Sequence, residues 1–360
     1  MGLTVFNNFF YKKKILITGC TGFKGTWLTL WLNTLGAKTF GIALNDKSKN
    51  LVFKKVNSST KIYYEDIRNL NKIKKIIKKI NPEIIFHFAA QSLVIKSYKD
   101  PILTWETNVM GTLNILESSK IANKLKTIII ATSDKCYAVK NKSKTKKFYF
   151  SENSSLGGED PYSASKAGQE LAVKSFYNSS SNLKFNIVTI RAGNVIGGGD
   201  WSENRIIPDL FRAFKTNKKI FIRNPHQIRP WQYVLDCIQG YLLVCYKVSH
   251  SNLKMNNINI GPPKKEIYTV KKIINLFEEF ISIKSQIQPN SIFKETNTLL
   301  LDSSLANKKF KFKSVLNIFD TVKFTSDWYL NDIKNKELIY AKQLKLYLSM
   351  AKEKKLSWIK

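Results

Sequence analysis

Tyr162 and Lys166 are the residues whose types and spacing most directly indicate chemistry. They form the segment Tyr-Ser-Ala-Ser-Lys, which places them one helical turn apart on the same face of a helix. An ammonium group beside a phenol lowers the pKa of the phenol, so Tyr162 is suited to exchanging a proton with a substrate hydroxyl during hydride transfer. The pattern alone is common on helix surfaces, and its meaning depends on the elements around it.

Ser133 is a candidate third member of this group. It lies in the segment Thr-Ser-Asp-Lys-Cys-Tyr, directly after an apolar run that predicts a strand. A hydroxyl at the end of such a strand is positioned to complete a Ser/Tyr/Lys triad. Cys136 follows closely, but it has no histidine partner nearby, so we do not expect a nucleophilic thiol.

A glycine-rich segment near the N-terminus predicts a dinucleotide site. In ILITGCTGFKGTWL, Gly19, Gly22 and Gly25 follow an expected strand and open an expected helix. Glycine permits a tight turn and close backbone approach, so that a pyrophosphate can bind at the helix N-terminus. The expected cofactor contacts in this segment are Gly19, Thr21, Gly22, Phe23, Lys24 and Gly25.

The identity of the dinucleotide is less sharply indicated. Asp46 could accept hydrogen bonds from the ribose hydroxyls of NAD, although Lys47 and Lys49 leave room for a 2′-phosphate. NAD is the favoured interpretation. Asp66 and Ile67, at the end of the expected third strand, are predicted to lie beside the adenine, while Asp66 could equally cap the following helix.

Short apolar runs alternate with helical patterns through the first half of the chain, which is typical of parallel βαβ units. The expected strands are 14–19, 38–44, 62–66, 83–88, 127–132 and 186–191, and the expected helices are 22–35, 102–122 and 162–177. The fold class is therefore α/β, with a Rossmann-type doubly wound parallel sheet and a smaller, interwoven C-terminal substrate-binding lobe. We expect residues 10–192 to bind the cofactor, residues 193–335 to form most of the second lobe, and residues 336–360 to form a helical tail.

The composition excludes several classes. The formal charge of +33 over 360 residues would favour nucleic acid, but the lysines are scattered and no stripe interleaves them with aromatic residues. We expect no nucleic-acid or membrane partner, because no run approaches the ~18 apolar residues of a membrane span. The four cysteines have neither disulfide-scaffold nor zinc-site spacing, so no metal is expected. A cytoplasmic protein is the default.

Arginine is informative because the sequence has only six against 53 lysines, and five of the six lie between Arg191 and Arg229. Where lysine is the default cation, arginine marks places that need a rigid bidentate fork, such as a phosphate clamp. We favour a clamp for Arg229, whereas Arg212 could simply face solvent on a helix. Chance clustering is the alternative.

Taken in order, several segments resemble the extended short-chain dehydrogenase/reductase family, and within it the nucleotide-sugar dehydratases, most closely the subfamily that acts on CDP-glucose. The segments are TGCTGFKGTWL, HFAAQSLVIKSYKDP, TNVMGTLNILE, TSDKCY, LGGEDPYSASK, RAGNVIGGGDW and RPWQYVLD. They cover about residues 10 to 335. A series of matching motifs in the same order is far more specific than any one motif.

The resemblance implies an internal redox reaction on a nucleotide sugar, used in deoxysugar biosynthesis such as that of lipopolysaccharide O-antigen. Tyr162 would deprotonate the C4 hydroxyl as hydride passes to NAD. Water would then be eliminated across C5 and C6, and the hydride would return to C6. The implied product is a 4-keto-6-deoxy sugar.

The elimination would involve Asp134 and Lys135. Asp134 fits the proton donor to the leaving C6 hydroxyl if its surroundings keep it protonated. Related dehydratases typically carry Glu at the next position, whereas this sequence has Lys135, as the subfamily acting on CDP-glucose does. Lys135 would then be a neutral base or would polarise the C4 ketone. A surface ion pair is the less favoured interpretation.

The resemblance also implies contacts around the two ligands. Asn194, Arg205 and Arg229 would grip the nucleotide diphosphate, and Gln91 and Ser133 would contact the sugar. Trp231 and Tyr233 could flank the base or sugar, or could pack in the core. The further cofactor contacts expected are Ala89, Ala90, Gln91 and Asn108, whereas His87 is expected to be a core histidine.

Other functions remain open at this point. A 4,6-dehydratase that acts on another nucleotide sugar is one alternative. An epimerase is another, since it would share Tyr162 and Lys166 but would not need Asp134 with Lys135. A noncatalytic dinucleotide-binding regulator commonly loses the tyrosine or the lysine, and this sequence retains both. Members of the family pair through two long helices, here 101–122 and 162–177, so a homodimer is expected.

Overall fold

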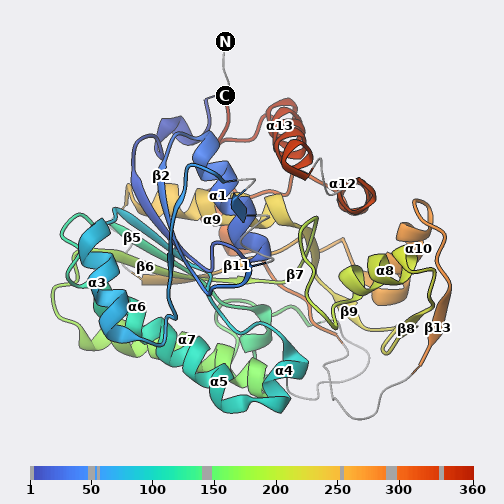
Figure 1. The fold of residues 1–360 in the computed structure, drawn as a ribbon, viewed down its shortest axis with the longest axis horizontal. Coiled ribbons are helices and arrows are strands. Elements are labelled where there is room, and N and C mark those ends of the chain that lie inside the picture. Colours follow the sequence, from blue (N-terminus) through green and yellow to red (C-terminus); the bar gives the residue numbers. More distant parts are fainter. Residues whose placement is uncertain are drawn as a thin grey trace.

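The computed structural model describes residues 4–47, 53–54, 57–139, 148–251, 255–288, 298–331 and 336–360. At its centre is a parallel sheet of seven strands in the order β11-β6-β5-β4-β1-β2-β3 (Figure 1). The strands are β1 (Lys14–Thr18), β2 (Lys38–Ala43), β3 (Lys61–Tyr64), β4 (Ile84–His87), β5 (Thr127–Ala131), β6 (Asn186–Ala192) and β11 (Met255–Ile260). The predicted doubly wound parallel sheet is confirmed.

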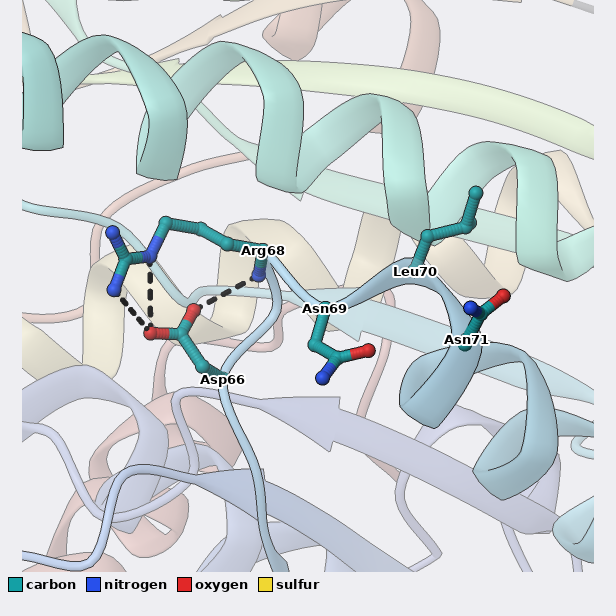
Figure 2. A pocket seen from close by; sticks show the side chains of 5 residues that line it. All are labelled: Asp66, Arg68, Asn69, Leu70 and Asn71. Atoms are coloured by element: carbon teal, nitrogen blue, oxygen red, sulfur yellow. Dashed lines mark hydrogen bonds and ion pairs between the residues drawn. The ribbon is translucent and has the colours of Figure 1, made fainter.

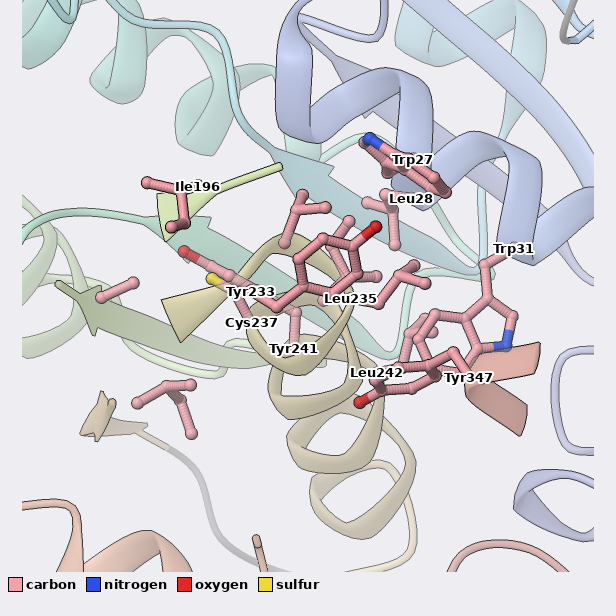
Figure 3. Packing of buried hydrophobic residues seen from close by; sticks show 14 of the residues in the cluster. Trp27, Leu28, Trp31, Ile196, Tyr233, Leu235, Cys237, Tyr241, Leu242 and Tyr347 are labelled. Carbon is pink, nitrogen blue, oxygen red and sulfur yellow. The ribbon is translucent and has the colours of Figure 1, made fainter. Parts of the chain in front are cut away.

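Both faces of the sheet are covered, because alternate side chains of each strand point to opposite faces. Ile15 and Ile17 of β1 face one core, while Leu16 between them faces the other. Helices α1 (Phe23–Thr34) and α9 (Val234–Val248) cover the first face, and α3 (Leu70–Ile80), α6 (Gly111–Ser119) and α7 (Pro161–Ser179) cover the second. The larger core includes Trp27 and Trp31 of α1 packed near α9 (Figure 3).

The strand order reverses between β1 and β4, since β2 and β3 continue to one side and β5, β6 and β11 to the other. In open α/β sheets, ligands bind in the crevice at such a switch point, outside the carboxyl ends of the strands. The loops after β1, β4 and β5 leave the sheet side by side at this edge. They carry the glycine-rich segment, Ala89 to Gln91, and Ser133 with Asp134.

The long helix expected over residues 102–122 is interrupted. Helix α4 (Val94–Lys99) precedes α5 (Pro101–Trp105), and a π-helical turn, η2 (Glu106–Met110), separates α5 from α6. A π-turn adds one residue to the helical turn and is frequent at functional sites. Here it contains Asn108, which is fully buried.

The second lobe consists of short strand pairs and helices. The strands are β7 (Asn194–Ile196), β8 (Ile220–Ile222), β9 (Ile228–Arg229), β10 (Trp231–Tyr233), β12 (Tyr268–Thr269) and β13 (Ser285–Ile287), paired β10-β7, β12-β9 and β13-β8. Helices α8 (Ile206–Lys215), α10 (Val270–Glu278), α11 (Ser304–Phe310) and α12 (Ile318–Leu330) complete it. In sequence, α9 and β11 lie between elements of the second lobe. In space, β11 is a strand of the central sheet and α9 packs on its face, so the chain crosses between the two parts more than once.

The two ends of the chain meet on the α1 side of the molecule (Figure 1). Val5 forms an antiparallel bridge with Ile359, and Phe6 stacks on Trp358 with ring centroids 5.2 Å apart. Helix α13 (Lys336–Glu353) buries Tyr340 and Tyr347 in the same core as Trp27 and Trp31. Among the described residues, no helix is long and apolar enough to cross a bilayer.

Candidate active site

The turn after β5 carries the first group of predicted catalytic residues. It is a short 3-10 helix, η3 (Asp134–Cys136), and Ser133 is its N-cap, accepting a hydrogen bond from the Lys135 N–H at 3.2 Å. The Ser133 hydroxyl also lies 3.0 Å from Asp134 Oδ1 and donates to it. The structure thus brings together the predicted Ser133, Asp134 and Lys135.

Asp134 occupies a position suited to a neutral carboxyl group. It is only 3% exposed, and its Oδ2 has no hydrogen-bond partner among the described residues. Burial raises the pKa of Asp134, opposed by the Lys135 charge, the Ser133 hydrogen bond and the Arg229 charge. A protonated Asp134 can donate from the carboxyl oxygen that the protein leaves unpaired.

Helix α7 brings Tyr162 and Lys166 to this turn. Asp160 caps the helix by accepting from the Ser163 N–H at 2.9 Å, and Pro161 occupies its first turn, where a missing N–H has no cost. Tyr162 lies close enough to Ser133 for that side chain to lower its pKa, so the predicted Ser133, Tyr162 and Lys166 come together. Cys136, at the end of η3, is fully buried. Burial raises the pKa of its thiol well above the usual range, which agrees with the expectation that it is not a nucleophile.

The electrostatics of the pair differ from the expectation. Burial raises the pKa of Tyr162 to about 12, despite the Ser133 hydrogen bond and the Arg205 charge. Burial and the nearby Lys24 lower the pKa of Lys166 to about 7. Lys166 Nζ donates to Gln169 Oε1 at 2.9 Å and to the Ala131 carbonyl at 3.4 Å. Desolvation therefore outweighs the predicted lowering of the Tyr162 pKa.

Buried polar residues connect this pair to the loop after β4. Asn108 accepts from the Gln91 N–H at 2.8 Å and donates to the Gln91 carbonyl and the Ser165 hydroxyl at 3.0 and 2.9 Å. The Gln91 amide donates to Thr104 and Leu93, so its side chain fixes the loop. His87 is bonded to Thr18 and Thr112, and burial followed by the Lys166 charge lowers its pKa to about 3, as suits the predicted core histidine.

The glycine-rich loop has the shape that a bound pyrophosphate needs. Gly19 has φ +68°, and a Cβ there would lie 2.7 Å from the Ala89 nitrogen. A Cβ on Gly25 would lie 2.2 Å from the Gly19 carbonyl oxygen. Helix α1 begins after Gly22 with no side-chain cap, so its first N–H groups are left for a ligand. Lys24 lies beside this loop with Nζ 5.7 Å from the Phe88 ring centroid, and burial lowers its pKa.

A pocket of about 500 Å³ lies at the end of β3, where the adenine is predicted to bind (Figure 2). It is lined by Asp66, Arg68, Asn69, Leu70 and Asn71. Arg68 forms ion pairs of 2.8 Å with both Asp66 and Glu106. The alternative role of Asp66 as a helix cap is wrong, because Asn69 caps α3 by accepting from the Lys72 N–H.

Other residues near this end are less constrained. Ile67 is buried and is not among the residues that line the pocket. Asp46 and Lys47 follow β2, with Asp46 partly exposed and Lys47 exposed, while Lys49 lies outside the described residues. The preference for NAD over NADP therefore stays a prediction from the sequence.

The predicted substrate residues approach from the second lobe. Arg229 is 4% exposed and close enough to influence Asp134, and it donates to Gln227 Oε1 at 2.7 Å. Arg205 pairs with Asp200 at 2.8 Å and donates to the Ser92 hydroxyl at 3.0 Å. Asn194 lies in β7, opposite Trp231 in β10.

Trp231 and Tyr233 pack inward. Trp231 is 3% exposed and its indole donates to the Tyr268 carbonyl, while Tyr233 is fully buried and donates to Gln343. Of the two predicted alternatives for Tyr233, the structure therefore shows packing in the core. Arg212 pairs with Asp209 and donates to the carbonyls of Trp201 and Ser202, so it fixes a loop as well as facing solvent.

Glu170 and Arg191 form a buried ion pair next to the turn that follows β5. Neither residue was predicted from the sequence to belong to the site. A signal was present in both cases. Glu170 lies four residues after Lys166, on the same helix face, and Arg191 is one of the few arginines that the chain retains.

A dinucleotide-type crevice with Ser133, Tyr162 and Lys166 beside it defines a short-chain dehydrogenase/reductase of the extended type. The family model described as GDP-mannose 4,6 dehydratase matches residues 16–324, and the chain belongs to that family. The chain is 36% identical to the CDP-glucose 4,6-dehydratase of Salmonella typhimurium, over 92% of this chain and 94% of that protein.

Two further comparisons agree with this class. The dTDP-D-glucose 4,6-dehydratase of Dictyostelium discoideum is 32% identical over 73% of this chain and 62% of its own length. A crystal structure of UDP-glucose-4-epimerase from Stenotrophomonas maltophila, with bound NAD and formylated UDP-arabinopyranose, superimposes with a TM-score of 0.77. It covers 88% of this chain and 98% of that chain at 17% identity, which shows the shared fold.

Proposed function

We propose that this protein converts CDP-glucose to CDP-4-keto-6-deoxyglucose in an NAD-dependent reaction in the cytoplasm. The observation that carries the proposal is the position of Asp134: a buried carboxyl group with one unpaired oxygen, bonded to the serine that lies near Tyr162. Oxidation needs only the tyrosine and lysine. An additional proton donor at the same place serves elimination of water.

NAD, when bound, supplies the acceptor that takes the C4 hydride and later returns it to C6. Tyr162, in its phenolate form, accepts the proton of the C4 hydroxyl as the C4 ketone forms, with Ser133 holding the sugar oxygen. The ketone acidifies the C5 proton, and as that proton leaves, the C6–O bond breaks. Asp134 donates the proton with which the C6 hydroxyl departs as water. Lys135 either removes the C5 proton as a neutral amine or polarises the C4 ketone while water takes that proton. A proton returns to C5 as the hydride adds to C6.

The binding residues follow from the same geometry. The glycine-rich loop and the N-terminus of α1 fit the pyrophosphate of NAD, and the pocket at Asp66 fits its adenosine end. We propose that residues 10–192 hold the cofactor, that residues 193–335 hold the nucleotide sugar, and that residues 336–360 close the core. In the second part, Asn194, Arg205, Arg229 and Trp231 are the proposed contacts to the nucleotide sugar.

The test is incubation of the protein with NAD and CDP-glucose, followed by mass spectrometry of the nucleotide sugar. Loss of one water from CDP-glucose, with no such loss from dTDP-, UDP- or GDP-glucose, is the expected result. An unchanged mass with inverted C4 configuration would show an epimerase instead. Loss of water from another nucleotide sugar alone would retain the dehydratase and correct the base.

We further propose a homodimer formed through α5, η2 and α7. Three large apolar side chains of α5 and η2 are solvent-exposed, Ile102 by 73%, Trp105 by 42% and Met110 by 52%, and Leu171 of α7 is 55% exposed. A pocket in this face is lined by Pro101, Ile102, Trp105, Glu106, Val109 and Met110. Exposed apolar patches of this kind mark interfaces, and a second copy presents the same patch. Light scattering that shows a monomer would refute the dimer.

A further inference from the structure

A buried ion pair lies behind the catalytic turn and takes no direct part in the proposed reaction. Glu170 of α7 and Arg191 of β6 are 4% and 3% exposed, and Arg191 Nη2 lies 2.9 Å from Glu170 Oε2. The Glu170 carboxylate also accepts from Thr132 at 2.6 Å and from Thr189 at 2.8 Å. Three donors on one buried carboxylate give it a single, well-defined orientation.

The partners of this pair bracket the catalytic turn. Thr132 immediately precedes Ser133, and its hydroxyl is held by Glu170. Tyr137 immediately follows Cys136, and its hydroxyl accepts from Arg191 Nη1 at 3.0 Å. Tyr137 in turn donates to Asn259 of β11 at 2.6 Å, and the Arg191 guanidinium lies 5.0 Å from the Tyr137 ring centroid.

The same carboxylate is linked to the second catalytic element. Glu170 lies one helical turn beyond Lys166 on α7, and its charge opposes the lowering of the Lys166 pKa. Movement of α7 relative to the turn would therefore change both the Tyr162–Ser133 contact and the bonds to Glu170. Hydrogen bonds in a buried network strengthen one another and favour one arrangement of the elements they join, here with Arg191 Nε as the one atom of the pair that has no partner among the described residues.

We propose that Glu170 and Arg191 are positioning residues that hold both ends of the Thr132–Tyr137 turn and so fix Ser133, Asp134 and Lys135 relative to Tyr162. The catalytic consequence rests on the proposed dehydratase function. The anchoring itself is a property of the fold. A displacement of about 1 Å at a reacting group can lower a rate about 100-fold, so the anchors matter although none of them touches substrate.

Two threonines provide a matched pair of variants, because each donates one hydrogen bond to the same carboxylate from a buried position. Thr132→Val removes the anchor next to Ser133, whereas Thr189→Val removes a bond from the middle of β6, opposite Ile130 of β5 and outside the turn itself. We expect Thr132→Val to lower kcat for CDP-glucose about 10- to 100-fold with little change in KM. Thr189→Val should change kcat less than about threefold at a similar loss of Tm, and Thr132→Ser, which keeps the hydroxyl, should restore kcat.

Tyr137→Phe tests the other end of the turn and should also lower kcat more than Thr189→Val. Equal loss of kcat in Thr132→Val and Thr189→Val, or failure of Thr132→Ser to restore it, would overturn the proposal. Amide hydrogen exchange of residues 133–137 gives a readout that needs no activity, and it should be faster in Thr132→Val than in Thr189→Val. A wild-type protein inactive on CDP-glucose would refute the dehydratase function alone, and equal exchange in the two variants would refute the anchoring.

Discussion

Arg191 and Arg68 form ion pairs of nearly equal length in opposite surroundings. The Arg191–Glu170 pair spans 2.9 Å with side chains 3% and 4% exposed, whereas the Arg68–Asp66 pair spans 2.8 Å with side chains 39% and 33% exposed. Water can replace either partner of the second pair but not of the first. The turn from Thr132 to Tyr137 is therefore held by groups with no alternative partner, while the proposed adenine pocket is lined by groups that can exchange partners.

The largest expected effect lies at the reacting group of the buried region. Tyr162→Phe removes the acceptor of the C4 hydroxyl proton, and we expect the rate of NAD reduction on adding CDP-glucose to fall at least about 1,000-fold. Absorbance of reduced NAD in single-turnover experiments measures this. A near-normal yield of the 4-keto product would contradict the assignment of Tyr162.

Glu170→Gln tests whether the buried ion pair contributes more to the free energy of unfolding than the exposed pair does. It leaves Arg191 buried without its counter-ion, and we expect the free energy of unfolding to drop by about 3–5 kcal/mol. Urea unfolding followed by fluorescence measures the change. A loss below about 1 kcal/mol would show that the buried pair is worth no more than an exposed one.

Asp134→Asn separates the two halves of the proposed reaction. The amide keeps the shape but cannot supply the proton to the leaving C6 hydroxyl, so we expect dehydration to slow at least about 100-fold while C4 oxidation continues. Reduced NAD should then accumulate on the enzyme. If water is eliminated from the sugar at the wild-type rate, Asp134 is not the donor.

Lys166 adds a pH dependence to the buried region. Its pKa is lowered to about 7 in the folded protein, mainly by burial, from 10.5 in a free side chain. Between these values the unfolded chain binds a proton that the folded chain lacks, so this group makes stability rise with pH. Below about pH 7 the cost of burying the charge is constant. We therefore expect the free energy of unfolding of Lys166→Met, relative to the wild type, to be at least about 1 kcal/mol more favourable at pH 6.5 than at pH 10. Both proteins are measured without added cofactor. A gain independent of pH would contradict the lowered pKa.

The smallest effect is expected at the exposed pair. Arg68→Gln should change the free energy of unfolding by less than about 1 kcal/mol, because its partners Asp66 and Glu106 gain water in its place. The same urea experiment serves as the matched control for Glu170→Gln. A loss as large as that of Glu170→Gln would remove the distinction between the two regions.

Much of the fold followed from local patterns. The apolar runs before Gly19, Ala89 and Thr132 predicted β1, β4 and β5 to within one or two residues at each end. The π-turn at Asn108 could not be predicted, because nothing in the local sequence marks where a helix accepts an extra residue. It is set by the bonds of Asn108 to Gln91 and Ser165, which come from other elements.

The electrostatics of the site were the weakest prediction. The spacing of Tyr162 and Lys166 indicated a lowered tyrosine pKa, but spacing along one helix says nothing of how deeply that helix is buried. Burial raises the pKa of Tyr162 and lowers that of Lys166 because it removes water from both charged forms. The same burial raises the pKa of Asp134. This supports the protonated carboxyl group that its predicted role as a proton donor requires.

By itself, the sequence determined the class of sheet, the glycine-rich loop and the identity of the chemical groups, since these depend on residue types at short spacing. Only the tertiary structure decided which groups share the site and in which charge state. Thr132 directly follows β5, Glu170 lies in α7 and Arg191 in β6, and the three meet because these elements pack together. Their hydrogen bonds are strong for the same reason that the sequence did not reveal them: both depend on the exclusion of water by residues far apart in the chain.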